Sequence, residues 1–214
     1  VYEVVYDENK NKATGVRVID SETMDVIEYK AKVIFLCAST APTTSILLQS
    51  KSSRFPNGLG NDSGELGHNL MDHHFLLGAD GVYDGFEDKY YKGRHASCIY
   101  IPRFRNLGES TNHKDFLRGY GFQGGAWRSD HRELIKKTGY GKELKDAVLT
   151  PGGWGMNLGG FGEVLPYHDN KIYLDYNKTD KWGLPTITFD AEIKENEKAM
   201  RKDIKQQAAE MLES

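Results

Sequence analysis

The chain has 214 residues, of which 38% are hydrophobic and 28% are charged, and its formal net charge is -3. A chain of this size can bury a sizeable core without disulfides or a structural metal. It carries no basic stripe of the kind that binds nucleic acid or an anionic membrane. Its longest apolar run, residues 33–38, is far shorter than the roughly 20 residues of a membrane-spanning helix.

The first third of the chain is expected to form a β-meander, a buried strand and a short helix. β-rich or alternating segments predict three short strands at residues 1–6, 15–20 and 24–29. Residues 33–38 are apolar without alternation, which is typical of a strand covered on both faces in a parallel sheet. Cys37 is therefore expected to be a buried thiol. Pro42 lies near the start of a helical spacing at residues 43–50.

The rest of the chain is expected to be mostly antiparallel. After a polar loop at residues 51–65, strands are predicted at 75–83, 95–105, 119–128, 152–163, 171–176 and 185–189. A short helix is predicted at residues 129–138. A final helix is expected to be capped by Asp190 and to bury one stripe of side chains, namely Met200, Ile204, Ala208 and Met211.

Two motifs follow one another between residues 39 and 73. The first is Ser39-Thr40-Ala41-Pro42-Thr43-Thr44-Ser45-Ile46-Leu47-Leu48 and the second is Leu66-Gly67-His68-Asn69-Leu70-Met71-Asp72-His73. The first resembles the Gly-Ala-x-x-Ser-Pro signature of glucose-methanol-choline (GMC) oxidoreductases, with Ser39 replacing the glycine and Thr44 the proline. The second is similar to that family's Val-Gly-x-Asn-Leu-x-Asp-His.

Further similarity to the family lies at residues 162–166, 170–175 and 180–185, and it is weakest between residues 75 and 152. The overall resemblance is closer to the branch that handles glucose, gluconate and related polyols than to choline or cholesterol oxidases. It implies a flavin enzyme that transfers a hydride from an alcohol or sugar carbon to FAD. Its partners would be that small substrate and an electron acceptor.

The resemblance also implies an α+β fold in three parts. Residues 1–74 would be the end of a Rossmann-like FAD-binding domain with its β-meander, and residues 75–190 an antiparallel substrate-domain sheet with flanking helices. Residues 191–214 would be a helix that leads toward the catalytic segment. The chain has neither a Gly-x-Gly-x-x-Gly before the meander nor the family's C-terminal pair of a His and a second His or Asn. We therefore expect it to be an inactive internal piece without catalytic residues.

Six residues are predicted on the cofactor side: Ala38, Ser39, Thr40, Asn69, Asp72 and His73. The first three are small, so the backbone can approach a cofactor, although an ordinary strand-to-helix turn has the same composition. The resemblance implies that the last three form hydrogen bonds that lock the connection between domains near the flavin. His68, Asp72, His73 and His74 are also ligand-type side chains, and the alternative for them is a zinc or iron site.

Other side chains suggest substrate contacts. Trp127, Trp154 and Phe161 lie beside glycines and would either stack on a sugar or pack in a core. Arginines that would bind a sugar acid, or simply lie on the surface, are Arg103, Arg105 and Arg128. Besides the flavoenzyme, the sequence leaves open a non-catalytic carbohydrate-binding β-domain and a metal-binding domain.

Overall fold

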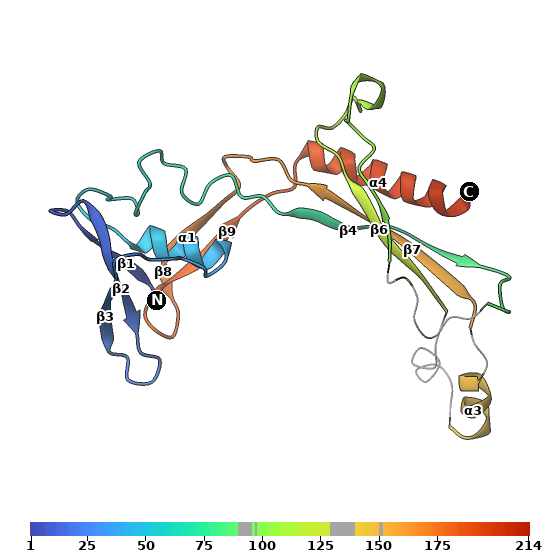
Figure 1. Ribbon diagram of the computed structural model, residues 1–214, viewed down its shortest axis with the longest axis horizontal. Helices are drawn as coiled ribbons and strands as arrows, with labels where there is room; N and C mark the ends of the chain where they lie inside the picture. Colours follow the sequence, from blue (N-terminus) through green and yellow to red (C-terminus); the bar gives the residue numbers. More distant parts are fainter. Residues whose placement is uncertain (90–95, 97, 129–139, 150–151) are drawn as a thin grey trace. The chain divides into compact units, whose positions relative to one another are not determined.

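A computed structural model describes residues 1–89, 96, 98–128, 140–149 and 152–214 (Figure 1). This part of the chain divides into two compact units, of which the first contains Val1–Met71 and Leu165–Glu192. The second contains Asp72–Val164 and Ile193–Ser214. The fold is α+β, and every strand pairing described is antiparallel. The helix predicted at residues 129–138 lies outside the described residues.

The first unit contains the predicted meander. Strands β1 (Glu3–Asp7), β2 (Lys12–Ile19) and β3 (Val26–Lys30) form a sheet in the order β1-β2-β3. Helix α1 (Thr40–Gln49) packs against β1 and against the hairpin of β8 (Lys171–Thr179) and β9 (Pro185–Asp190). The three-stranded meander and the helix are therefore confirmed.

The buried strand predicted at residues 33–38 is wrong for this structure. These residues form no strand, and Val33 and Phe35 are 67% and 82% exposed. Cys37 is exposed as well, so the prediction of a buried thiol is also wrong. A strand becomes buried when it pairs within a sheet whose two faces are covered by other elements. No strand in the described part of the chain pairs with this segment.

The second unit is a four-stranded sheet covered on one face by a helix (Figure 1). Its strand order is β4-β7-β6-β5, from the following strands: β4 (His73–Tyr83), β5 (Ile99–Ile101), β6 (Gly121–Arg128) and β7 (Trp154–Glu163). Helix α4 (Glu195–Glu213) packs on β4 and β7. The 3-10 turn η1 (Glu109–Thr111) and helix α3 (Lys142–Leu149) were not predicted from the sequence.

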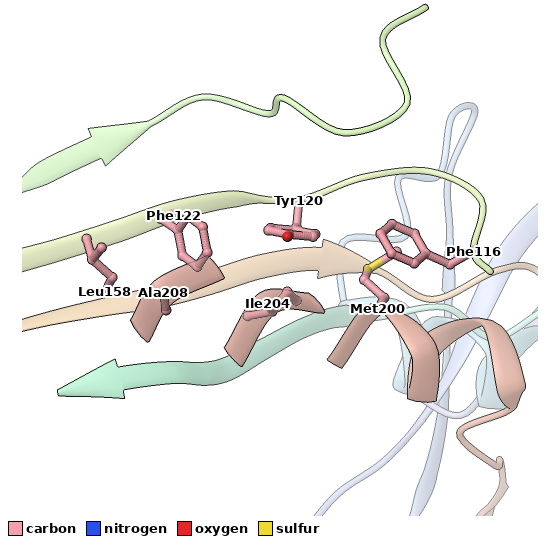
Figure 2. Close-up of a cluster of buried hydrophobic side chains, with 7 residues drawn as sticks. All are labelled: Phe116, Tyr120, Phe122, Leu158, Met200, Ile204 and Ala208. Carbon is pink, nitrogen blue, oxygen red and sulfur yellow. The ribbon is translucent and has the colours of Figure 1, made fainter. Parts of the chain in front are cut away.

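The core of the second unit is the seam between α4 and the sheet. Met200, Ile204 and Ala208 are fully buried, as the helical spacing predicts (Figure 2). They contact buried side chains of the sheet, Phe122 and Leu158, and of the loop before β6, Phe116 and Tyr120. Met211 packs against this cluster and is partly buried.

Two glycines of β7 bring the helix close to the sheet. A β-carbon at Gly160 would lie 2.4 Å from Ile204 Cγ2, and one at Gly162 would lie 2.5 Å from Met200 Sδ. A side chain at either position would force Ile204 or Met200 to shift, because real β-carbons almost never approach other atoms within 3.0 Å. The glycines therefore set the spacing at which the helix packs.

The final helix starts later than predicted. Asp190 ends β9 rather than capping α4, and the helix begins at Glu195. The carboxylate of Glu197 accepts the backbone N–H of Lys194 at 3.3 Å, which satisfies a donor at the helix start. Residues just before Lys194 are unavailable to the helix, because Glu192 uses both its backbone groups in hydrogen bonds to the side chain of Asn170.

The strands between residues 75 and 190 belong to two sheets, because β8 and β9 pair with each other in the first unit. The division of the chain into an FAD-domain end, a substrate domain and a linking helix stays a prediction. No helix in the described ranges is long and apolar enough to cross a membrane.

Replacing Ile204 by Ala is expected to lower the free energy of unfolding by about 2–5 kcal/mol, because it leaves a cavity against Gly160 and Leu158. Urea titration of the chain followed by tryptophan fluorescence measures this. The control is Lys205→Ala on the exposed side of α4, for which a change below about 0.5 kcal/mol is expected. Equal effects of the two substitutions would contradict the described packing of α4.

Candidate cofactor-binding site

The residues at the start of α1 are small and exposed. Ala38 and Thr40 flank Ser39, which is the N-cap residue with φ 66° and ψ 176° and makes no side-chain capping bond. Its carbonyl accepts the N–H of Thr43 at 3.0 Å, which starts the helix. This backbone conformation is essentially restricted to glycine, and a serine there stores about 1–3 kcal/mol of strain. Ser39 is also the position at which the GMC signature has glycine.

The second motif lies beside α1, the helix that the first motif forms. Gly67 has φ +91°, and a β-carbon there would lie 2.3 Å from the carbonyl oxygen of Ile172 and 3.7 Å from Thr44 Cγ2. Gly58, with φ +111°, is similarly close to the backbone of α1, and the N–H of Leu59 donates to Leu47 at 2.9 Å. Only glycine fits at Gly67, for reasons of both conformation and space.

The predicted cofactor residues of the second motif lie on both sides of the boundary between the units. Asn69 is in the first unit, has φ 57°, and donates from Nδ2 to Glu65 Oε2 at 2.5 Å. Asp72 and His73 are exposed and begin the second unit, where Asp72 Oδ1 accepts the N–H of His73 at 2.7 Å. Ala38, Ser39 and Thr40 are thus exposed side by side at the start of α1. The hydrogen bonds described for Asn69, Asp72 and His73 join residues at most four positions apart in the sequence.

Two histidines join the second motif to a segment 100 residues later. The Nδ1 atom of His68 lies 2.6 Å from the carbonyl oxygen of His168, so Nδ1 carries a proton and donates it. The two rings stack with their centroids 4.0 Å apart. His168 Nε2 lies 3.8 Å from a carboxylate oxygen of Glu65, which also bonds Asn69. His68 therefore acts as a packing and hydrogen-bonding group in this loop.

Asn170 is a buried polar residue that the sequence analysis did not single out. It is 3% exposed, and its side-chain amide donates to the carbonyl of Glu192 at 3.1 Å and accepts the Glu192 N–H at 3.0 Å. Its carbonyl accepts the N–H of Leu70 at 2.9 Å. The feature of the sequence that could have identified Asn170 is its position directly before β8, inside a segment similar to the GMC family.

No metal site forms from the histidine cluster. His74 is 2% exposed, and its Nε2 accepts a hydrogen bond from Arg201 Nε at 2.9 Å. His68 is engaged with His168, as described above. In the ranges that the structure describes, no three His, Cys, Asp or Glu side chains lie close enough to hold a metal ion. The metal alternative for residues 68–74 therefore has no support in the geometry.

The three arginines are engaged within the second unit. Arg105 binds Asp203 through two hydrogen bonds of 2.8 and 2.9 Å. Burial tends to raise the pKa of Asp203, but hydrogen bonds from Arg105 and Tyr120 outweigh it and lower that pKa. Arg128 is 7% exposed and donates to the carbonyls of Glu87 and Gly152 at 2.8 Å.

Arg103 donates to the carbonyl of Arg105 at 3.0 Å. Because all three side chains already bond to groups of the chain, the prediction that they bind a sugar acid has no support in this structure.

The face of the sheet opposite α4, here called the outer face, combines aromatic and hydrogen-bonding side chains. Because side chains alternate along β7, Gly160 and Gly162 face α4 whereas Gly159 and Phe161 face away. Cross-strand partners share a face. The outer face therefore carries Asp80, Val82, Gln123, Trp127, Asn157 and Phe161.

The predicted aromatic residues divide between the two faces. On the outer face, Trp127 is 45% exposed, and Phe161 is 37% exposed and stacks on Phe75 with centroids 6.1 Å apart. Trp154 lies on the α4 side, where Nε1 donates to the carbonyl of Phe86 at 2.9 Å. It lines an apolar pocket of about 350 Å³ with Tyr83, Phe86 and Met156. The three aromatics thus form no single stacking surface.

Comparison with known proteins agrees with the two motifs. Residues 1–75 match the family model described as GMC oxidoreductase. The chain is 31% identical over 194 residues to 2-methyl-1,2-propanediol dehydrogenase of Mycolicibacterium austroafricanum, which covers 88% of this chain and 34% of that protein. It is 25% identical over 183 residues to the fructose dehydrogenase large subunit of Gluconobacter japonicus, which covers 85% of this chain and 33% of that subunit.

The motifs, their packing in the first unit and these matches agree on one assignment: the chain belongs to the GMC oxidoreductase family. Its named relatives are dehydrogenases. The chain spans about a third of the length of the curated relatives that it matches.

Gly67→Ala is expected to destabilise the chain by at least about 2 kcal/mol, because the new methyl group would collide with the Ile172 carbonyl in addition to straining the backbone. Gly64→Ala is the matched control: Gly64 has φ +77° and open space around it, so only the backbone cost of about 1–2 kcal/mol applies. Thermal unfolding of both variants gives the difference. If the two were equally stable, the close approach of Gly67 to Ile172 would be contradicted.

The stability of the chain is expected to fall as the pH drops below about 6.5, the ordinary pKa of histidine. Burial, and then the positive charge of Arg201, lowers the pKa of His74 in the folded chain. The unfolded chain therefore takes up the proton first, and this loss continues until the pH reaches the folded pKa. His74→Gln removes this contribution, whereas exposed His73→Gln keeps it. Urea unfolding at pH 7.5 and 5.5 measures both variants, and an unchanged pH dependence in His74→Gln would refute the assignment.

Proposed function

We propose that the chain is part of an FAD-dependent oxidoreductase that oxidises a CH–OH group of a sugar, polyol or other alcohol. Family membership and the dehydrogenase names of both relatives support an oxidoreductase of this kind. One relative is named for a diol and the other for a sugar, which supports hydroxylated small molecules as the substrate class. An electron acceptor is the second partner in this proposal.

The observation that carries the proposal is the backbone at the start of α1. Ala38, Ser39 and Thr40 are exposed and small, so no bulky side chain keeps a planar ring from approaching the peptide groups. The glycine-like conformation of Ser39 is the kind of strain that proteins retain at binding sites. The residues present therefore fit a flavin, and FAD supplies the hydride acceptor for oxidation of an alcohol carbon.

In this proposal, Asn69, Asp72 and His73 complete the cofactor-side residues. Asn69 is held by Glu65 in a loop that packs on α1 through Gly67. The carboxylate of Asp72 is fixed by the N–H of His73. None of the residues of this chain is proposed as the base that removes the hydroxyl proton, and the chain by itself is expected to be inactive.

The outer face of the sheet is the proposed substrate side. Asp80, Gln123 and Asn157 offer acceptors and donors for hydroxyl groups, and Trp127 offers an exposed aromatic ring for the C–H face of a sugar. Between them, Gly159 leaves the backbone uncovered, since a β-carbon there would meet only the Gln123 carbonyl, at 3.5 Å. A polyol can therefore lie flat on this surface.

The same outer face supports the second candidate, a non-catalytic carbohydrate-binding β-domain. Aromatic and amide side chains over a flat sheet are sufficient for sugar binding without any cofactor. The two candidates differ in their need for the exposed backbone at Ser39, for which a pure binding module has no use.

The test is flavin binding by the protein that the complete reading frame encodes. We expect one FAD per protein, and we expect Ala38→Leu to weaken FAD binding at least about tenfold, because its side chain would cover the approach to Ser39. Ser21→Leu, a substitution of similar size in an exposed turn, is the control. Flavin fluorescence titration measures both variants. If the wild-type protein bound no flavin, the carbohydrate-binding β-domain would become the favoured candidate.

A further inference from the structure

Asn69 lies between two backbone hydrogen bonds to the beginning of β8. On one side the carbonyl of Gly67 accepts the N–H of Ile172 at 2.7 Å, and on the other the N–H of Leu70 donates to the carbonyl of Asn170 at 2.9 Å. These bonds fix the ends of a three-peptide span in which Asn69 takes φ 57°. The conformation of Asn69 therefore depends on where the segment 170–172 is held.

Asn170 anchors the start of that segment, and the pairing of Lys171 and Ile172 with β9 holds the rest. The side chain of Asn170 pairs with Glu192 through two hydrogen bonds, of 3.0 and 3.1 Å, and its own N–H donates to the carbonyl of Tyr167 at 3.0 Å. Asn170 is 3% exposed, and its two bonds to the exposed Glu192 are partly buried. All of the residues involved belong to the first unit.

The arrangement ties together the two places where the chain leaves the first unit. The first stretch of this unit ends at Met71, directly after Leu70, and its second stretch runs from Leu165 to Glu192. Asn170 contacts the first through its carbonyl and the end of the second through its amide. Truncating the amide would remove the partners of the Glu192 N–H and C=O in two part-buried hydrogen bonds.

We propose that Asn170 is a positioning residue for the cofactor site: its amide, by holding segment 170–172 against Glu192, fixes the loop from Gly67 to Leu70 in the conformation in which Asn69 is presented to the flavin. This inference rests on the proposed function, because it assigns a role toward FAD. Asn170 itself touches only protein groups, and it acts through Leu70 and the backbone of the loop.

The test combines two measurements on Asn170→Ala. In the chain without cofactor, hydrogen exchange of the Leu70 and Glu192 amides is expected to become about tenfold faster. In the protein from the complete reading frame, the Kd for FAD is expected to rise about tenfold. Asn177→Ala, at an exposed position of the same strand β8, is the matched control and should change neither value. If Asn170→Ala does not fold, Asn170→Asp replaces it, because it keeps the Oδ1 acceptor and the shape but loses the Nδ2 donor.

The outcomes separate this inference from the proposed function. Faster exchange with an unchanged Kd for FAD would make Asn170 a purely structural residue and overturn the inference alone. Unchanged exchange would overturn it too, since the loop would not depend on the amide. A wild-type protein that binds no FAD would remove the proposed function and this inference together, and the wild-type titration by itself reveals that case.

Discussion

The first unit depends on one non-covalent junction, because it is built from two stretches of chain separated by most of the second unit. The junction is the pair of backbone bonds between residues 67–70 and 170–172, reinforced by the stacked His68 and His168. It requires a glycine at Gly67, where another side chain would collide with Ile172. Together with the packing of α1 on the hairpin of β8 and β9, this junction fixes the hairpin in the first unit.

In the second unit, glycine also permits a close approach, here between a helix and a sheet. Gly160 and Gly162 let α4 approach the sheet so closely that Met200 and Ile204 are fully buried. The core then forms on one face only, which leaves the outer face free for hydrogen-bonding and aromatic side chains. Close approach at glycine thus supports a loop next to the proposed cofactor residues in one unit, and in the other the sheet whose outer face is the proposed substrate side.

The two motifs indicate the family and contain five of the six candidate residues, and the sixth, Ala38, directly precedes the first motif. The structure adds the backbone conformations and hydrogen bonds of those residues. Ser39 takes a conformation that glycine usually takes. Asn69 lies between two backbone bonds, one from Leu70 to Asn170 and one from Ile172 to Gly67. Asn170 was not predicted because a buried amide has no periodic signature in the sequence. Its importance follows from partners 22 and 100 residues away, Glu192 and Leu70.

The sequence by itself determined the kinds of elements and the apolar stripe of α4, because local periodicity records which side chains must face a core. Only the tertiary structure decided that residues 33–38 are exposed, that His74 bonds Arg201, and that α4 starts at Glu195. In each of these cases the outcome depends on a distant partner: a neighbouring strand, an arginine on α4, or the Asn170 side chain. Burial and hydrogen bonding are properties of pairs of segments, so a pattern within one segment cannot specify them.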